Sequence, residues 1–121
     1  MSSDFDRCDL KERTTAFAIQ IVHLYRQLPL KDGYDIQVAG KQIIRSGTSV
    51  AANYREASRA RSKADFISKI DICSQEADET LLWLEILTRG CNLNIKEIEP
   101  LMQEADELIS IFVTMSKKSK D

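Results

Sequence analysis

The sequence predicts an all-α protein: an antiparallel up-down-up-down four-helix bundle with left-handed, shallow packing. Along four segments the apolar residues recur in alternating steps of four and three, the seam spacing of helices that cross at a shallow angle. Residues 42–80 contain one Gly and no Pro, which favours long helices over a turn-rich β fold. Short loops between long helices favour antiparallel neighbours. A length of 121 residues predicts a single four-helix bundle domain over residues 1–121.

Local start and stop signals set the bounds of each helix. Asp9, followed three residues later by an acid, is the expected N-cap of the first helix, and Pro29 ends that helix. Ser62 with Asp65 is the capping signal of the third helix. The last residues, 116–121, are expected to fray. The four helices are expected at about residues 10–28, 34–60, 63–88 and 95–115.

Two further signals concern the second and fourth helices. Gly40 and Gly47 lie on the seam of the second helix, although each Gly costs about 1 kcal/mol relative to Ala in a helix. We expect a neighbouring backbone to approach closely at both positions. A phosphate-binding loop is not favoured, because no G-x-G-x-x-G or Walker pattern is present. Pro100 must lie in or near the first turn of the fourth helix, so that helix starts at either Ile95 or Ile98.

The charges are segregated along the chain. Residues 41–69 carry seven basic and two acidic side chains, a net charge of +5, whereas residues 71–107 carry two basic and ten acidic ones, a net charge of −8. One interpretation is a basic surface that meets a polyanion. The other is attraction between helices of one bundle or between subunits.

No combination of residues typical of an enzyme is present. His23, the only histidine, has no carboxylate at helical spacing to orient it, and no Glu-x-x-His motif of a di-metal bundle occurs. The three cysteines match neither a disulfide framework nor a zinc spacing. We therefore expect no enzymatic activity, no catalytic residue, no metal, no cofactor and no small-molecule substrate.

We expect neither a signal peptide nor a membrane-spanning segment in this sequence. Its first residues are polar and acidic, unlike a signal peptide, and its longest apolar runs fall far short of the roughly 20 residues that span a bilayer. Together with the unpaired cysteines, this predicts a cytoplasmic protein without a membrane partner.

Basic residues surround the expected turn between the second and third helices. The only nearby aromatic residues, Tyr54 and Phe66, lie at seam positions, so we expect contact with a nucleic-acid backbone and no base stacking. The candidate nucleic-acid-binding residues are Arg55, Arg59, Arg61, Lys63 and Lys69.

A hairpin that turns near Arg61 would bring Arg45 level with Glu76 and Glu79. We expect a partly buried ion pair of Arg45 with one of these acids, which would hold the register of the two helices. The candidate structural polar network comprises Arg45, Ser46, Ser49, Asn53, Glu76 and Glu79.

Two long motifs resemble a known family. RSGTSVAANYREASRARSKADF, from Arg45 to Phe66, and EADETLLWLEIL, from Glu76 to Leu87, are similar in order and spacing to the bacterial four-helix bundle family, also called the 23S rRNA intervening-sequence protein family. The resemblance implies an up-down bundle that assembles into a ring-like homopentamer. A related accessory protein of diversity-generating retroelements is a basic pentamer that binds nucleic acid. This chain differs from that relative in its pI of about 5.5.

Two functions remain open at this point. The first is a homo-oligomeric scaffold that binds RNA or DNA through the basic arc; the second is a protein-protein assembly module without nucleic-acid binding. The second function covers assembly with further copies of the chain or with a protein partner. The helices carry more apolar residues than one seam needs, which indicates a subunit interface. Segregated charge suits the head-to-tail contacts of a ring better than the self-complementary contact of a dimer, so we expect a pentamer. The surplus apolar residues are Ala18, Ile19, Val22, Tyr25, Ile67, Leu81, Trp83, Met102, Ile109, Ile111 and Val113.

Overall fold

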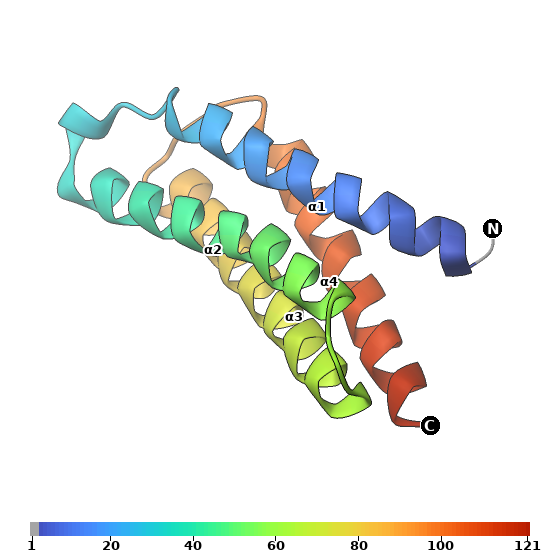
Figure 1. Ribbon diagram of the computed structural model, residues 1–121. Helices are drawn as coiled ribbons and strands as arrows, with labels where there is room; N and C mark the ends of the chain where they lie inside the picture. The colour runs from blue at the N-terminus through green and yellow to red at the C-terminus, as the bar shows by residue number, and fades with distance from the viewer. Residues whose placement is uncertain (1–2) are drawn as a thin grey trace.

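A computed structural model describes the backbone of residues 3–121 and the side chains of residues 10–121. Four long helices pack side by side in antiparallel order, and the turn between the second and third helices lies at the same end as the C-terminus (Figure 1). This described part contains no strand, as the sequence predicts. The elements are α1 (Ser3–Tyr25), the short 3-10 turn η1 (Leu30–Asp32), α2 (Tyr34–Ser58), α3 (Lys63–Glu85), the π-helical turn η2 (Ile86–Gly90) and α4 (Ile98–Lys120).

The first helix is displaced toward the N-terminus relative to its prediction. It begins at Ser3, so Asp9 lies inside the helix and the prediction of Asp9 as N-cap is wrong. No Pro or Gly stands between Ser3 and Leu10 to stop the helix earlier. At the other end, the amide of Leu28 bonds to the carbonyl of Tyr25 at 3.1 Å, an i to i−3 contact that tightens the chain before Pro29.

A wide turn joins α3 to the loop before α4. In η2 the amide of Cys91 donates to the carbonyl of Ile86 at 2.9 Å, and the extra residue per turn keeps Leu87 fully buried. The loop that follows reverses at Asn92, whose φ of 57° is left-handed. Pro100 is accommodated in the first turn of α4, which starts at Ile98.

The C-terminal segment is helical, and the prediction that residues 116–121 fray was wrong. Ser116 is only 4% exposed, so the last turns of α4 still pack against the bundle. Lys117, Lys118 and Lys120 stand in the final turn, where cations interact favourably with the helix dipole.

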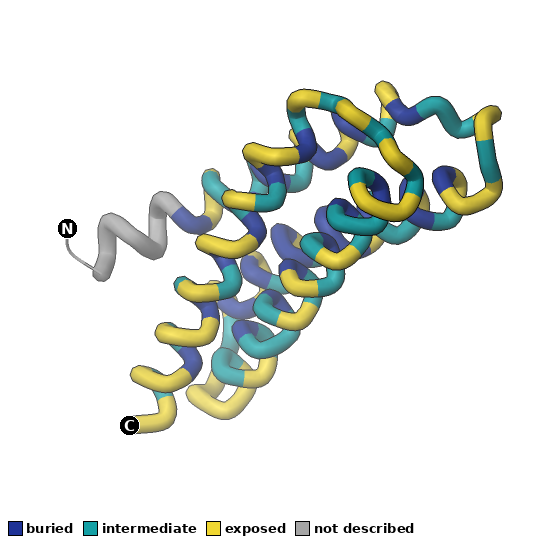
Figure 2. The backbone as a smooth tube through the Cα atoms, turned by 180° about the vertical axis from the view of Figure 1, so that it is seen from behind, coloured by how far each residue is buried: buried dark blue, intermediate teal, exposed yellow. Residues whose placement is uncertain are grey.

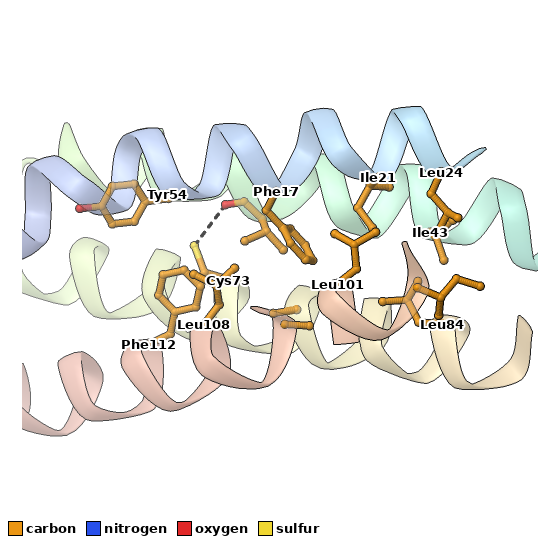
Figure 3. Close-up of a cluster of buried hydrophobic side chains, with 14 of the residues drawn as sticks. Phe17, Ile21, Leu24, Ile43, Tyr54, Cys73, Leu84, Leu101, Leu108 and Phe112 are labelled. Atoms are coloured by element: carbon orange, nitrogen blue, oxygen red, sulfur yellow. Dashed lines mark hydrogen bonds between the residues drawn. The ribbon is translucent and has the colours of Figure 1, made fainter. Parts of the chain in front are cut away.

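The predicted seams form the core. Buried positions, dark blue in Figure 2, face the interior along all four helices. Phe17, Ile21, Leu84, Leu108 and Phe112 are among the fully buried side chains at its centre (Figure 3). Phe66 departs from the pattern, because it lies at a seam position and is only partly buried.

The two seam glycines of α2 lie against α1, but the atoms nearest to them belong to side chains and not to the neighbouring backbone that we expected. A Cβ added to Gly47 would stand 2.9 Å from Cγ1 of Ile21, and one added to Gly40 would stand 3.1 Å from Cδ1 of Leu28. A side chain at either position would therefore overlap α1 unless the neighbour moved. The pair of glycines permits a separation between α1 and α2 that Ala would oppose.

Candidate nucleic-acid interface

The candidate interface begins at the turn between α2 and α3. The helix α2 ends at Ser58, and α3 begins after Ser62, whose hydroxyl accepts a hydrogen bond from the amide of Asp65 at 3.0 Å. This cap holds a four-residue connection in which Arg59 and Arg61 are exposed, with Lys63 exposed on the first turn of α3. Among the residues whose side chains are described, no acid lies within ion-pair distance of these three cations.

The other two predicted cations of the arc have partners within the bundle. Lys69 donates to Oε1 of Glu56 at 2.8 Å, and this hydrogen bond raises the pKa of Lys69. Arg55 reaches across to α1, where its Nη2 donates to the hydroxyl of Thr15 at 2.9 Å. Their charges still contribute to the local field, but the exposed cations at the turn are better placed to meet a phosphate.

Sequence reasoning missed four more cations at the same end. Lys11 of α1, Lys63 of α3 and Ser119 of α4 line one open hollow in the surface, so these helices meet there. Lys117, Lys118 and Lys120 flank Ser119 and are exposed. Antiparallel topology alone places the end of the fourth helix beside the α2–α3 turn, a signal that the expectation of a frayed tail obscured. We call the combined set the basic end: Lys11, Arg55, Arg59, Arg61, Lys63, Lys117, Lys118 and Lys120.

An open hollow of about 520 Å³ lies in the middle of the basic end. Its surface is mostly apolar, and Phe66, which the seam pattern had assigned to the core, is partly exposed there. The centroid of the buried Tyr54 ring lies 6.3 Å from that of Phe112. Tyr54 therefore lines the hollow on one side and packs against the core on the other. The lining residues are Lys11, Tyr54, Ala57, Ser58, Ala60, Lys63, Phe66 and Ser119.

The polar residues between α2 and α3 lie away from this end. Nη1 of Arg45 is 3.2 Å from Oε1 of Glu76, and Nη2 of the same guanidinium pairs with Glu79. The side chain of Arg45 is 49% exposed, so solvent screens both pairs and each contributes about 1 kcal/mol or less. The two helices of the hairpin therefore have the expected register. Within the ion pair, the side chain of Arg45 is more exposed than that of Glu76.

A buried hydrogen bond stands beside these ion pairs. The hydroxyl of Thr80 lies 2.7 Å from that of Ser46, and both residues are fully buried. Ser46 in turn donates to the carbonyl of Gln42 at 2.8 Å, which satisfies the hydroxyl within α2. Thr80 was not among the residues expected in the polar network, and its role as partner of Ser46 was not predicted.

Ser49 and Asn53 do not join the two helices. The amide of Asn53 donates to the carbonyl and to the hydroxyl of Ser49, each at 2.9 Å, so these two residues of the expected network interact within α2. Across from them the thiol of Cys73 donates to the carbonyl of Val50 at 3.7 Å. Burial raises the pKa of the Cys73 thiol to about 12, which keeps it protonated and unreactive at neutral pH.

A second ion-pair cluster, which the sequence did not suggest, joins α1 to α4. Arg13 donates from Nε to Oε2 of Glu104 at 2.7 Å and from Nη2 to Oε1 of the same carboxylate at 2.8 Å. A further bond reaches Oε1 of Glu107 at 3.0 Å. Hydrogen bonding to Glu104 raises the pKa of Arg13 further above its ordinary value. This two-point contact is the geometry in which an arginine binds a carboxylate most strongly.

No group of three or more His, Cys, Asp or Glu side chains among the described residues is arranged to hold a metal ion. None of the described helices combines the length and the apolar character needed to cross a bilayer.

Comparisons with known proteins agree on one family. Residues 7–114 match the family described as 23S rRNA-intervening sequence protein. A crystal structure of a protein of unknown function from the S23 ribosomal protein family of Bacteroides thetaiotaomicron is similar, with a TM-score of 0.79 and 38% sequence identity, over 89% of this chain and 98% of that one. No curated protein matches the chain.

Proposed function

The chain belongs to the 23S rRNA-intervening sequence protein family, and we propose that it is a non-enzymatic, self-assembling bundle that binds RNA or DNA through its basic end. One observation carries the proposal: cations from all four helices and from the α2–α3 turn gather at one end of an otherwise acidic chain. Neutralising phosphates with Lys and Arg supplies most of the affinity of sequence-independent nucleic-acid binding. The whole chain has a pI of about 5.5, and ten of its nineteen acids lie in residues 71–107; Glu56 and Asp65 stand near the α2–α3 turn and lower the net charge there.

The binding mode follows from the exposure of these cations. Arg59, Arg61 and Lys63 are exposed and have no acidic partner among the described side chains, so a phosphate can approach them without breaking an ion pair. The lysines of the last turn of α4 extend this surface to a second helix. Flexible cations of this kind contact phosphates and fix the position of a strand without reading its sequence.

A salt titration tests nucleic-acid binding. We expect the logarithm of affinity for an oligonucleotide to fall linearly with the logarithm of salt concentration, with a slope of about −0.7 per phosphate neutralised on a single strand and about −0.9 on duplex DNA. The double variant Arg59→Ala, Lys63→Ala should flatten the slope. Lys31→Ala, Lys41→Ala is the matched control, because it removes the same charge from exposed positions far along the bundle from the basic end. No binding at ~50 mM salt would leave the assembly function alone.

Self-assembly is the second part of the proposal, and by itself the alternative to nucleic-acid binding. Ile19 is 49% exposed and Val22 is 37% exposed on α1, while Leu82 of α3 and Val113 of α4 are 51% and 38% exposed. Apolar side chains exposed on several helices favour contact with further copies. Since the charge is segregated along the chain, a head-to-tail ring can oppose unlike charges, which supports a pentamer over a twofold dimer.

Light scattering at low micromolar concentration tests assembly. We expect a mass near five times 13.8 kDa. The variant Ile19→Lys should lower that mass with helicity unchanged, whereas Gln20→Lys, at the next exposed position, should not. A wild-type mass of one or two chains would contradict the ring.

A further inference from the structure

The hollow at the basic end combines an apolar surface with a cationic rim. We propose that it receives one unpaired base of a nucleic-acid strand, which makes single-stranded RNA or DNA the preferred ligand. This inference rests on the proposed function and names the form of nucleic acid that the basic end recognises. It also revises the expectation that Phe66 is closed off in the seam, because Phe66 lines the hollow and is partly exposed, whereas Tyr54 remains buried.

The lining suits the face of a base. Phe66 offers a partly exposed ring, and the side chains of Ala57 and Ala60 add apolar surface without filling the space. Every base has a π-face that stacks on an aromatic ring, and such stacking does not depend on sequence. The hydroxyl of Ser58 is already donated to the carbonyl of Arg55 at 2.8 Å. The site therefore distinguishes poorly between the different bases and binds an unpaired base of any kind.

The rim suits the phosphates on either side of that base. Lys11 of α1 and Lys63 of α3 belong to the lining itself, and they come from different helices. Arg59 and Arg61 continue the positive surface on the turn, as do the exposed lysines next to Ser119 on α4. A strand that places one base in the hollow thus has cations available to the phosphates that precede and follow it.

The volume of the hollow and the cost of unpairing a base together favour single strands over double strands. A volume of about 520 Å³ falls within the range of roughly 300–1,000 Å³ that is usual for sites of small organic molecules. A base inside a duplex must first be unpaired and unstacked, which costs a few kcal/mol, whereas a single strand avoids most of that cost. The hollow therefore favours single strands, while the cations alone would bind either form.

The test compares bases with a bare backbone. The wild-type protein should bind a single-stranded oligonucleotide about tenfold more tightly than a fully abasic strand with the same number of phosphates. A 2-aminopurine in the strand should lose fluorescence on binding as it stacks. Phe66→Leu should remove most of the tenfold preference and the fluorescence change, with the salt slope unaltered, and Phe66→Trp should retain both. Circular dichroism checks that the variants remain helical.

The possible outcomes separate this inference from the proposed function. Equal affinity of the wild type for the two strands, with an unaltered salt slope, overturns the hollow as a base site and leaves phosphate binding by the basic end in place. In that case a second measurement uses decanoate, which has an apolar chain and an anionic head. If decanoate protects Lys63 from chemical modification, the hollow is a site for small amphipathic anions instead. Failure to bind any strand at low salt overturns both proposals.

Discussion

Helix α1 is held to its two neighbours in different ways. Against α2 it packs by shape, with Ile21 filling the space that Gly47 leaves open and Leu28 standing close to Gly40. Against α4 the specific polar contact comes from Arg13, which binds the carboxylates of Glu104 and Glu107. The first contact excludes water and depends on atoms that cannot move far, because Ile21 is fully buried and β-branched. The second lies at the surface and depends on charge.

The difference separates what can be predicted from what cannot. Seam glycines and the apolar period appear within one helix, so a local pattern is enough to expect close packing. The pairing of Arg13 with Glu104 joins residues 91 positions apart, and the sequence offers several other acids in the same segment. Choosing the correct one requires the rotation of both helices about their axes, which the apolar period defines only roughly.

The largest effect is expected at the close contact of α1 and α2. In Gly47→Ala the new Cβ overlaps a stiff, buried side chain and the helix must shift, which costs about 1–3 kcal/mol. The gain in helix propensity from replacing Gly by Ala offsets about 1 kcal/mol of this cost, so the free energy of unfolding should fall by up to about 2 kcal/mol. Urea unfolding followed by circular dichroism measures the change.

Two other glycines serve as graded controls for that variant. Gly40→Ala should cost less, since its Cβ would stand 3.1 Å from the end of the Leu28 side chain and 3.2 Å from the ring of Tyr25, both farther than the 2.9 Å contact at Gly47. Gly90→Ala should be close to neutral, because its Cβ would meet Ile86 at 3.6 Å, an ordinary contact. Equal effects of all three variants would contradict the view that close packing distinguishes Gly47.

An intermediate effect is expected at the contact of α1 and α4. Arg13→Met should lower the free energy of unfolding by about 1 kcal/mol, since both Arg13 and Glu104 are about one quarter exposed and solvent weakens their attraction. A double-mutant cycle with Glu104→Gln isolates the pairwise contribution. We expect this coupling to shrink as salt is raised, whereas the cost of Gly47→Ala should not change. A coupling independent of salt would contradict the electrostatic nature of the contact.

The same distinction applies to the fold and the site as a whole. The class, the antiparallel order and the buried seams could be predicted, because each follows from a repeated local pattern. The bounds of α1 and α4 could not, since helices persist beyond their strongest caps when nothing breaks them, and Ser116 is buried by packing that its polar side chain does not suggest. The lysines at the end of α4, Lys117, Lys118 and Lys120, were missed for that reason.

The smallest effect at neutral pH is expected in the packed interior, at Cys73. The folded state raises the pKa of this thiol from 9.0 to about 12, so between these values the unfolded chain loses the proton and the folded chain keeps it. The unfolded state then binds fewer protons, and the free energy of unfolding falls as pH rises through that window. The fall should be negligible at pH 7 and about half a kcal/mol at pH 9, where half of the unfolded thiol is ionised. Urea unfolding of the reduced wild-type protein and of Cys73→Ala at both pH values gives the difference. An identical pH response of the two proteins would contradict the burial of this thiol in the folded state.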